Sequence, residues 1–441
     1  MRRDKALIIS MPFNIGVGGF KRSYFVLPYL SKLLREAFKE VELYIPANAI
    51  RTALKYLVYL NREYCQNVNT RECLDSLVKE LIESINEIVK ASRYNLDVNE
   101  KIIAKAIELN TRIIEKDISR LKINKHAITA HLIDRLRPLL TSLLEKKLWE
   151  SSRRYIAEYY SIIYSQHETA DALTTASLAA SRAEKVVILL QLDIKGLYVR
   201  DLLDKLKGKL AGFLSVSPQP IVESPFITGF SRQFKIITPS YSLDPKVLDF
   251  TSRIEHLKPS RERYRAVYFG RLSRDKGLPD LLKAWKLVIK EIPQAKLTLI
   301  GPPENTEILL LLERYRRELG KSIRYTGPLH GESLFSEVIT NDLLAYPSYR
   351  DSFSMTILES LTLGLKVIAY DIPIVRHFYG HSNMVYIVRK GDIKSFAKSV
   401  VHAFQEEKEP DSYTRALIMM HSSWERVANA EFKALISVLQ K

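Results

Sequence analysis

The chain has 441 residues, of which 46% are hydrophobic and 27% are charged. This length favours two domains, and the composition is that of an ordinary globular protein. The net charge of +17 suits an anionic partner such as a phosphorylated substrate, an anionic membrane or a nucleic acid. Because no helix-turn-helix, zinc-finger or RNA-binding sheet signature is recognisable, we expect no nucleic acid partner.

The first predicted elements are a strand, a glycine loop and a helix. The strand is "ALIIS" (6–10), the loop is "FNIGVGGFKR" (13–22) and the helix is "SYFVLPYLSKLLREAF" (23–38). The apolar run before Pro12 is short, which predicts a first strand and no signal peptide. No run reaches the roughly 18–20 apolar residues of a membrane span, so we expect a soluble, cytoplasmic protein.

A segment with helical character follows at about 51–157. It contains no glycine, one proline and no strand pattern, and we interpret it as a helical insertion. Cys65 and Cys73 flank a polar turn within it, and whether they form a disulfide stays open. No Cys/His cluster has zinc spacing, so we expect no structural metal. The wealth of Lys, Arg, Glu, Ile and Leu leans towards a thermophile.

The last part of this insertion combines leucines at helical spacing with basic residues. The segment is "RLKINKHAITAHLIDRLRPLLTSLLEKKLWESSRRY" (120–155). Such a mixture suits a helix that lies on an anionic membrane, which would place the protein at the inner face of the cell membrane. The alternative is a leucine stripe that packs against its own domain.

Alternating strands and helices resume at 160. The predicted strands are "YSIIYSQH" (160–167), "KVVILLQL" (185–192) and "AGFLSVS" (211–217), with helices at 170–184 and 196–208 between them. A connection follows at about 238–265. We therefore expect an N-terminal α/β domain at 1–245, completed by a C-terminal helix at about 425–441, and a second α/β domain at 246–424.

The second half shows the clearer alternation. Short β-branched or aromatic runs at 265–270, 296–301, 322–327, 342–348 and 366–371 alternate with helical patterns such as "LPDLLKAWKLVIKEI". This spacing predicts a parallel sheet with helices on both faces. Ligands of such sheets bind outside the carboxyl ends of the strands.

Two cations follow the first of these strands. Arg271 and Lys276 lie in "GRLSRDKG" (270–277), between a strand and a helix. Backbone amides and the helix dipole favour an anion at such a loop, and an Arg fork and a Lys add charge-assisted bonds to a diphosphate. The alternative is that both are solvated loop cations.

Two acids follow a later strand, in "YRDSFSMTILESLTLG" (349–364). Ser352 and Ser354 suit helix capping, and the amides from Phe353 onwards would then point towards an anion. Glu359 lies about one turn into the helix, where a carboxylate suits two sugar hydroxyls better than a phosphate. The pattern predicts a nucleotide with its ribose at Glu359 and the group beyond the phosphates at Asp351.

Four blocks in the order seen here resemble glycosyltransferase family 4, the retaining enzymes of the GT-B fold. They are "YFGRLSRDKGLPDLLKAW", "KLTLIGP", "IRYTGPL" and "DLLAYPSYRDSFSMTILESLTLGLKVIAYDIP". The resemblance covers residues 262 to 390 well, and the N-terminal glycine loop and "SSWERVA" (422–428) more loosely. It implies two doubly wound domains that face a cleft.

The resemblance also implies roles for the site residues. Arg271 and Lys276 would hold the donor diphosphate, Glu359 would bind the nucleotide ribose, and Asp351 would contact the donor sugar. Asp351 departs from the family, which has a glutamate here, and Ser352 and Ser354 replace frequent glycines. Asp351 is one methylene shorter than that glutamate, so its carboxylate would lie slightly further from the sugar.

The N-terminal half adds a second group of candidates. The backbone of Gly18 and Gly19 would approach the donor phosphate, and Lys21 and Arg22 follow them as cations or as plain surface residues. His167, Gln191 and Asp193 lie at the ends of predicted strands and are candidates for contact with the acceptor or donor sugar. The plain alternative for these three is that they are loop polar residues.

The expected reaction is transfer of a sugar from a nucleotide-diphosphate donor to a lipid-linked or glycan acceptor, with retention. No Asp-x-Asp occurs in the chain, so we expect neither metal nor other cofactor. Two other enzymes remain open on this fold, a glycoside phosphorylase and a sugar-nucleotide epimerase. A third hypothesis is a non-catalytic scaffold that keeps a relict nucleotide-sugar site.

Overall fold

The computed structural model of the chain describes residues 3–13, 18–46, 79, 158–192, 194, 197–230, 233–254 and 263–440. Apart from Lys79, the predicted insertion at about 51–157 lies outside the described residues, and so do Cys65, Cys73 and the basic, leucine-rich segment. Asp193 also lies outside them. In the described part of the chain, no helix is both long and apolar enough to cross a membrane.

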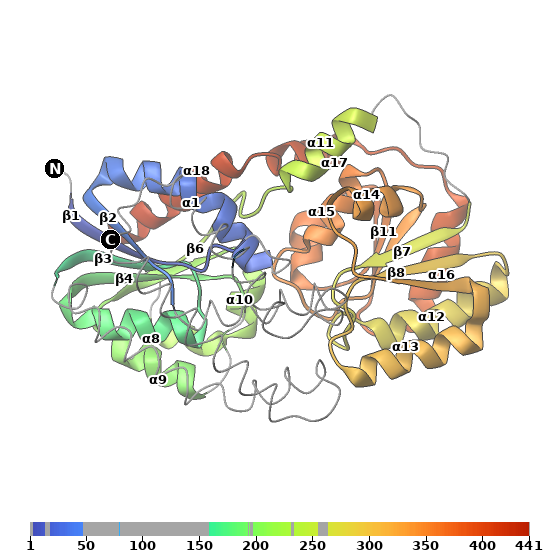
Figure 1. Cartoon of the computed structure of the whole chain (residues 1–441), viewed down its shortest axis with the longest axis horizontal. Coiled ribbons are helices and arrows are strands. Elements are labelled where there is room, and N and C mark those ends of the chain that lie inside the picture. The colour runs from blue at the N-terminus through green and yellow to red at the C-terminus, as the bar shows by residue number, and fades with distance from the viewer. Residues whose placement is uncertain are drawn as a thin grey trace. The chain divides into compact units, whose positions relative to one another are not determined.

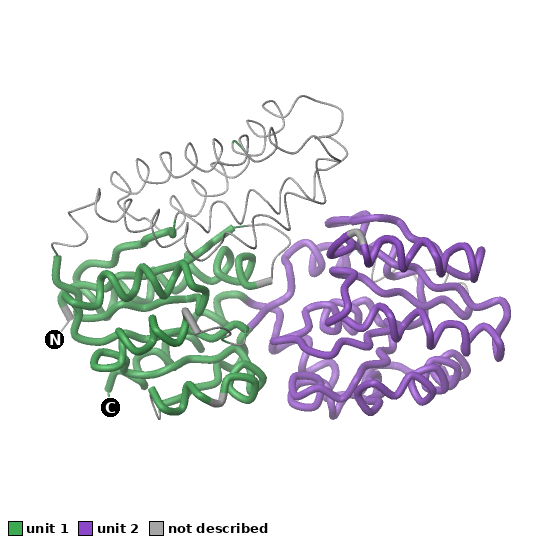
Figure 2. Tube along the Cα trace, turned by 90° about the horizontal axis from the view of Figure 1, so that it is seen from below, with its two compact units in different colours: residues 1–240, 424–441 green, residues 241–423 purple. Residues whose placement is uncertain are grey.

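The chain divides into two compact units (Figure 2). Unit 1 comprises Met1–Ser240 and Trp424–Lys441, and unit 2 comprises Tyr241–Ser423. These boundaries lie close to the division expected at 245/246, and the C-terminal helix belongs to the N-terminal unit. The chain therefore leaves unit 1, builds the whole of unit 2 and then returns.

Unit 1 is built on a six-stranded parallel sheet of order β2-β1-β3-β4-β5-β6 (Figure 1). Its strands are β1 (Arg3–Ile9), β2 (Phe38–Tyr44), β3 (Tyr160–Ser165), β4 (Ala183–Leu190), β5 (Leu210–Ser215) and β6 (Phe234–Ile236). The central strands are mostly apolar, since helices cover both faces of a parallel sheet. Every residue of β3, for example, is buried.

The helices of unit 1 lie on opposite sides of this sheet in Figure 1. They are α1 (Gly18–Ala37), α8 (Ala170–Ala179), α9 (Leu197–Leu206), α10 (Pro218–Glu223) and α18 (Trp424–Leu439). Helix α1 packs against α18, and α8 packs against α9. Phe25 of α1 stacks on Trp424 of α18, with ring centroids 5.1 Å apart.

Unit 2 repeats this architecture with a six-stranded parallel sheet of order β12-β11-β10-β7-β8-β9. Its strands are β7 (Arg265–Phe269), β8 (Lys296–Ile300), β9 (Ile323–Gly327), β10 (Leu343–Tyr346), β11 (Lys366–Tyr370) and β12 (Val385–Val388). The two doubly wound parallel sheets predicted from the sequence are confirmed.

The helices of unit 2 also cover both faces of its sheet. They are α11 (Pro245–Ile254), α12 (Leu278–Glu291), α13 (Thr306–Leu319), α14 (Gly331–Ile339), α15 (Met355–Thr362), the π-helix η4 (Val375–Tyr379), α16 (Ile393–Gln405) and α17 (Ser412–Met420). Helix α12 packs against α16, whereas α15 packs against α17. In Figure 1, α12 and α13 lie below the sheet, and α14 and α15 lie above it.

Helix α12 shows how the sequence specifies these elements. Leu278, Leu281, Leu282, Trp285 and Val288 recur at helical spacing and are all buried. Pro279 occupies the first turn, where its missing amide costs nothing, and the polar residues face outwards. The indole Nε1 of Trp285 donates to the Ser322 carbonyl at 3.2 Å, so this buried ring also has its polar atom satisfied.

Candidate active site

The topology of unit 2 places its ligand-binding edge between β7 and β10. From β7 the chain adds β8 and β9 on one side, and it then returns to add β10, β11 and β12 on the other. Strands β7 and β10 are direct neighbours, so the strand order reverses between them. Such a switch point leaves a crevice outside the carboxyl ends of the strands. The loops that follow β7 and β10 carry the predicted cations and acids.

A glycine lets these two loops pack closely. Gly277, at the start of α12, has φ of +75°, and a Cβ there would lie 1.8 Å from the Pro347 carbonyl oxygen. A side chain at Gly277 is therefore excluded on two grounds, backbone conformation and space. The Tyr349 amide also donates to the Asp275 carbonyl at 2.9 Å. The two loops form one continuous surface.

Lys276 and Asp351 meet across these loops. The Lys276 ammonium lies 2.7 Å from Asp351 Oδ2, and it also donates to the Arg350 carbonyl at 3.2 Å. Both side chains are about one-fifth exposed (19% and 20%), so this ion pair is partly shielded from water. The structure thus joins two predicted site residues from different strands.

The carboxylate of Asp351 is engaged on both oxygens. Oδ2 accepts from Lys276 and from the Tyr346 hydroxyl, and Oδ1 accepts from the amides of Ser352 (2.8 Å) and Phe353 (3.4 Å). Burial alone would raise the pKa of Asp351, but the Lys276 charge and these hydrogen bonds outweigh it. The pKa of Asp351 therefore lies below its ordinary value, and the group is ionised at neutral pH.

Arg271 is the more exposed of the two predicted cations. Its guanidinium pairs with Asp275 Oδ2 at 2.8 Å and with Glu304 Oε1 at 2.5 Å, and 42% of the side chain is exposed. Burial alone would raise the pKa of Asp275, but Ser273, Arg271 and Lys276 lower it below its ordinary value. An incoming diphosphate would exchange with these carboxylates, which keep the guanidinium oriented meanwhile.

The start of α15 lies against the end of β7. Thr356, in the first turn of α15, donates its hydroxyl to the carbonyl of Phe269, the last residue of β7, at 3.5 Å. Among the described residues, the backbone amides of Met355 and Thr356 donate to no acceptor. The positive end of this helix is thus available to an anion beside the loop of Arg271.

The predicted capping by serine side chains is wrong. Ser354 is the N-cap residue of α15, but its side chain makes no capping bond, and its backbone is left-handed with φ of +65°. The Ser354 hydroxyl instead donates to the Tyr346 hydroxyl at 3.3 Å. The amides of Ser352 and Phe353 are taken by Asp351, so of the amides expected to face an anion only those after Phe353 remain.

The side chain of Phe353 belongs to the core of unit 2. It is 1% exposed, stacks on Tyr241 with centroids 4.8 Å apart, and contacts the rings of Phe378 and His421 edge-on or tilted. The backbone of Phe353 is bonded within the unit, since its amide donates to Asp351 and its carbonyl accepts from Tyr379. Its ring anchors the loop that carries Asp351.

Glu359 is half-buried on α15, and its charge and that of Asp351 both act on the hydroxyl group of Tyr379. The buried Tyr379 hydroxyl donates to the carbonyls of Phe353 (3.0 Å) and Ser354 (3.2 Å). Its pKa lies well above the ordinary value because of burial, then the charge of Asp351, then that of Glu359. Both acids are therefore within electrostatic reach of a single hydroxyl group.

Sequence reasoning missed the tyrosines of this site. Tyr268 is the last residue but one of β7, Tyr346 is the last residue of β10, and their rings stack with centroids 6.5 Å apart. A hydroxyl-bearing ring at the end of an apolar strand was the available signal. Tyr379 lies in the π-helix η4, whose sequence carries no comparable pattern.

Unit 1 has its own switch point, between β1 and β3. Gly18 and Gly19 are the first residues of α1, which follows β1. A Cβ on Gly19 would lie 2.8 Å from Gln191 Oε1, so glycine here makes room for the Gln191 amide. The structure brings Gly19 and Gln191 together at the carboxyl edge of this sheet.

His167 lies beside Gln191 but is enclosed by protein. Its Nε2 is 3.0 Å from Ser23 Oγ, its Nδ1 is 3.5 Å from Gln191 Nε2, and the residue is 3% exposed. Burial, and then the charge of Arg22, lower the pKa of His167 to about 3. The imidazole is therefore neutral at physiological pH, and it supports Gln191 instead of facing solvent.

Arg22 is not a surface cation. It is fully buried, donates from Nε to the Ser240 carbonyl at 2.7 Å, and pairs with Glu431 of α18. The Glu431 carboxylate also accepts from Tyr164 (2.7 Å) and Gln166 (2.8 Å). This network holds α18 on unit 1, and it leaves no role for Arg22 as a phosphate ligand.

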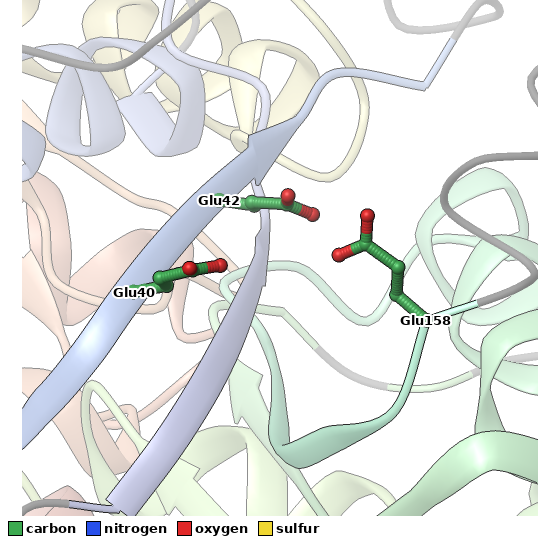
Figure 3. A group of neighbouring side chains, drawn as sticks. All are labelled: Glu40, Glu42 and Glu158. Carbon is green, nitrogen blue, oxygen red and sulfur yellow. The ribbon is translucent and has the colours of Figure 1, made fainter.

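Three acidic side chains of unit 1 gather at the opposite edge of its sheet, where Glu42 and Glu158 point towards one another beside Glu40 (Figure 3). Lys5 lies 3.3 Å from Glu40 and 2.7 Å from Glu42, and it also pairs with Glu158. A single ammonium thus pairs with all three carboxylates of this group. Glu158 precedes β3, whereas His167 follows it, so the cluster is separate from the candidate site.

Comparison with solved structures identifies the fold. Sucrose-phosphate synthase of Thermosynechococcus elongatus aligns over 100% of both chains, with a TM-score of 0.55 and 14% identity. Anabaena HepE, solved in complex with UDP-glucose, aligns over 99% of this chain and 97% of its own, with a TM-score of 0.51 and 14% identity. The protein has the GT-B fold, as the sequence predicted.

Sequence comparison points to the same class of protein. Residues 250–417, most of unit 2, match the family model of glycosyl transferases group 1. The poly(glycerol-phosphate) alpha-glucosyltransferase of Bacillus subtilis is 26% identical over 190 residues, which is 42% of this chain and 26% of the relative. The chain thus spans about a quarter of the length of that relative. The segment 250–417 that matches the family model includes Arg271, Lys276, Asp351 and Glu359.

Proposed function

We propose that the protein is a glycosyltransferase that moves a sugar from a nucleotide-diphosphate donor to an acceptor. The observation that carries this proposal is the convergence of two loops and a helix end at the switch point of unit 2. A lysine, an arginine and two amides of α15 lie there within the segment that matches group 1 glycosyl transferases. Glu359 lies one turn further along the same helix.

Each part of this site has a task in the reaction. Cleavage of the sugar–phosphate bond builds negative charge on the leaving diphosphate. Arg271, Lys276 and the N-terminus of α15 stabilise this charge without moving far, since they are already held in place. Glu359 accepts hydrogen bonds from the ribose hydroxyls.

The finer assignment follows family 4 of the glycosyltransferases. We propose retention of the anomeric configuration and a reaction that needs no metal, because cations of the chain serve the diphosphate. The proposed acceptor is lipid-linked or a glycan, and the proposed location is the cytoplasm, in part at the inner face of the membrane. The net charge of +17 supports attraction to anionic lipids, which sedimentation with anionic liposomes at low and high salt tests.

A donor assay tests the proposal. The purified chain is incubated with UDP-, GDP- and ADP-sugars, with and without EDTA, and the free nucleoside diphosphate is measured. UDP-sugars come first, since HepE was solved with UDP-glucose. We expect slow release of the diphosphate without acceptor, faster release with a crude lipid or glycan acceptor, and no effect of EDTA. NMR of the glycosylated product then reports its anomeric configuration.

The other three functions predict different outcomes of the same assay. A phosphorylase would cleave a glycoside only with inorganic phosphate and would not bind nucleotides. An epimerase would convert one nucleotide sugar into another without releasing the diphosphate. A non-catalytic scaffold would bind the donor and leave it intact.

A further inference from the structure

The Asp351 carboxylate has its hydrogen-bonding directions used within its own loop and by its neighbours. Two amides occupy Oδ1, and an ammonium and a phenol occupy Oδ2. The bond from the Phe353 amide closes an Asx-turn, which a short acidic side chain forms with the amide two residues ahead. A sugar hydroxyl would have to displace one of these four donors.

The turn accounts for the length of the side chain. An aspartate reaches the amides of Ser352 and Phe353 and Lys276 at the same time. A glutamate at 351, one methylene longer, would move the carboxylate away from the amides or past the ammonium. The shorter acid is therefore suited to this loop. The resemblance to glycosyltransferase family 4 implies a different role for it, as a ligand of the donor sugar.

Tyr346 fixes the carboxylate from behind. It is buried, donates to Asp351 Oδ2, accepts from the Ser354 hydroxyl at 3.3 Å, and stacks on Tyr268. Burial, and then the Asp351 charge, raise the pKa of Tyr346 well above its ordinary value, so the phenol keeps its proton as a donor. The phenol of Tyr346 therefore remains a hydrogen-bond donor to Asp351 and holds its carboxylate in place.

Lys276 is the group that this arrangement presents to solvent. An ammonium has three N–H donors, and the described residues take two of them, through Asp351 Oδ2 and the Arg350 carbonyl. A long flexible lysine is thereby fixed at two points, which lowers the entropy lost when it binds a ligand. One N–H remains for an incoming oxygen atom.

We propose that Asp351 and Tyr346 are positioning residues that hold Lys276 in place for the donor diphosphate, and that Asp351 does not bind the donor sugar. This inference rests on the proposed function, because it assigns the diphosphate to Lys276. It differs from the role that the family resemblance implies for the acid at this position.

Binding of a nucleoside diphosphate without a sugar tests this inference. Asp351→Glu keeps the charge and supplies the acid expected from the family, and Tyr346→Phe keeps the ring stack and removes only the hydroxyl. We expect each variant to bind the nucleoside diphosphate about tenfold more weakly, because Lys276 loses its fixed position. The affinity for the matching nucleotide sugar should fall by the same factor.

Tyr349→Phe is the matched control. Its hydroxyl donates to Asp280 on the adjacent α12 at 2.6 Å, and Tyr370 donates to the same oxygen at 2.9 Å, so Asp280 keeps a partner. This variant removes the same kind of bond from the same loop without touching Lys276. We expect its affinity for both ligands to equal that of the wild type.

Two results would overturn the inference. In the first, Asp351→Glu binds the nucleoside diphosphate normally and changes only the affinity for the nucleotide sugar, which is the behaviour of a sugar ligand. In the second, Tyr346→Phe leaves both affinities unchanged. If Asp351→Glu does not fold, as judged by circular dichroism, the affinity of Tyr346→Phe for the nucleoside diphosphate is the test of the inference. A wild-type chain that binds no nucleoside diphosphate would instead refute the proposed function.

Discussion

Arg22 of α1 and Glu431 of α18 form an ion pair in which neither side chain is exposed, with Nη2 and Oε2 2.6 Å apart. Taking two charges out of water is costly, and further hydrogen bonds within the protein offset part of that cost. Ser240, Tyr164 and Gln166 supply these bonds. The pair therefore makes α18 an obligatory part of unit 1.

Glu431→Gln should destabilise the protein strongly. The variant leaves the Arg22 charge buried without its carboxylate, which costs about 3–5 kcal/mol in comparable pairs. Urea unfolding of the full chain measures the loss. Glu425→Gln, at an exposed acid in the first turn of the same helix, is the control and should stay within about 0.5 kcal/mol of the wild type. Equal stability of the two variants would contradict a structural role for the pair.

His167 should make the stability of the protein depend on pH. Its pKa is about 3 in the folded state, because of burial and then Arg22, and about 6.5 when unfolded. Below pH 6.5 the unfolded chain binds a proton that the folded chain does not. The free energy of unfolding therefore falls as the pH drops from about 6.5 towards 3, by about 1.4 kcal/mol per pH unit from this group.

His167→Gln removes this contribution. The variant should be less stable than the wild type at pH 7. Its free energy of unfolding should fall less steeply between pH 6 and pH 4, because unfolding of the variant takes up about one proton less. His377→Gln, at an exposed histidine, should reproduce the wild-type slope. Parallel curves for wild type and His167→Gln would show that the imidazole is not held neutral by the fold.

Arg271→Ala and Lys276→Ala should each abolish most of the sugar transfer without unfolding the protein. Each removes a cation from a group that gains charge in the transition state, so a loss on the order of 10²-fold or more in donor turnover is expected. Arg274→Ala is a control from the same loop, where an exposed arginine pairs with Glu307. Near-normal turnover of both site variants would refute the assignment of the diphosphate to this loop.

Glu359→Gln should weaken nucleotide binding even in the absence of a sugar. A carboxylate that accepts from two ribose hydroxyls is worth about tenfold or more in affinity. Nucleoside diphosphates with a 2′,3′-dideoxyribose provide the control on the ligand side. The wild type should prefer the ribose form, and the variant should lose that preference. A preference that survives in Glu359→Gln would place the ribose elsewhere.

Ser354→Gly should stabilise unit 2. Ser354 has φ of +65°, a conformation that costs a residue with a Cβ about 1 kcal/mol and glycine almost nothing. The loss of its bond to Tyr346 and the greater freedom of the unfolded glycine offset part of this gain. Ser352→Gly, two residues earlier and outside the left-handed region, should not stabilise. Thermal unfolding of both variants distinguishes the relief of the left-handed conformation at Ser354 from the general effect of replacing a serine with glycine.

The sequence predicted the central strands of both sheets but not three of the edge strands. Strands β2, β6 and β12 lie at sheet edges, and their residues are partly exposed. Strand β2, "FKEVELY", carries Lys39, Glu40 and Glu42, so it lacks the apolar run by which a buried parallel strand is found. The pattern of hydrophobic residues therefore did not identify β2, whose alternate positions are charged and partly exposed.

The candidate site was predictable in its charged residues and not in its supporting bonds. Arg271, Lys276 and Asp351 follow strands, and a parallel sheet brings such residues to one edge. That Asp351 would bond the amides of Ser352 and Phe353 depends on the backbone of the loop, including the left-handed Ser354. These dihedral angles are set by packing around Phe353 and Tyr379, which no local pattern reports.

The return of the chain to unit 1 has a consequence for biosynthesis. A ribosome makes Arg22 early, and the partner that neutralises it, Glu431, emerges only after all of residues 241–423 has been made. Unit 2 is contiguous and can fold as it leaves the ribosome. The N-terminal sheet, in contrast, lacks the covering helix α18 until the last residues have been made. Synthesis that stops after Ser423 but before Glu431 would therefore release a polypeptide in which the second unit is complete and the first is a substrate for chaperones and proteases.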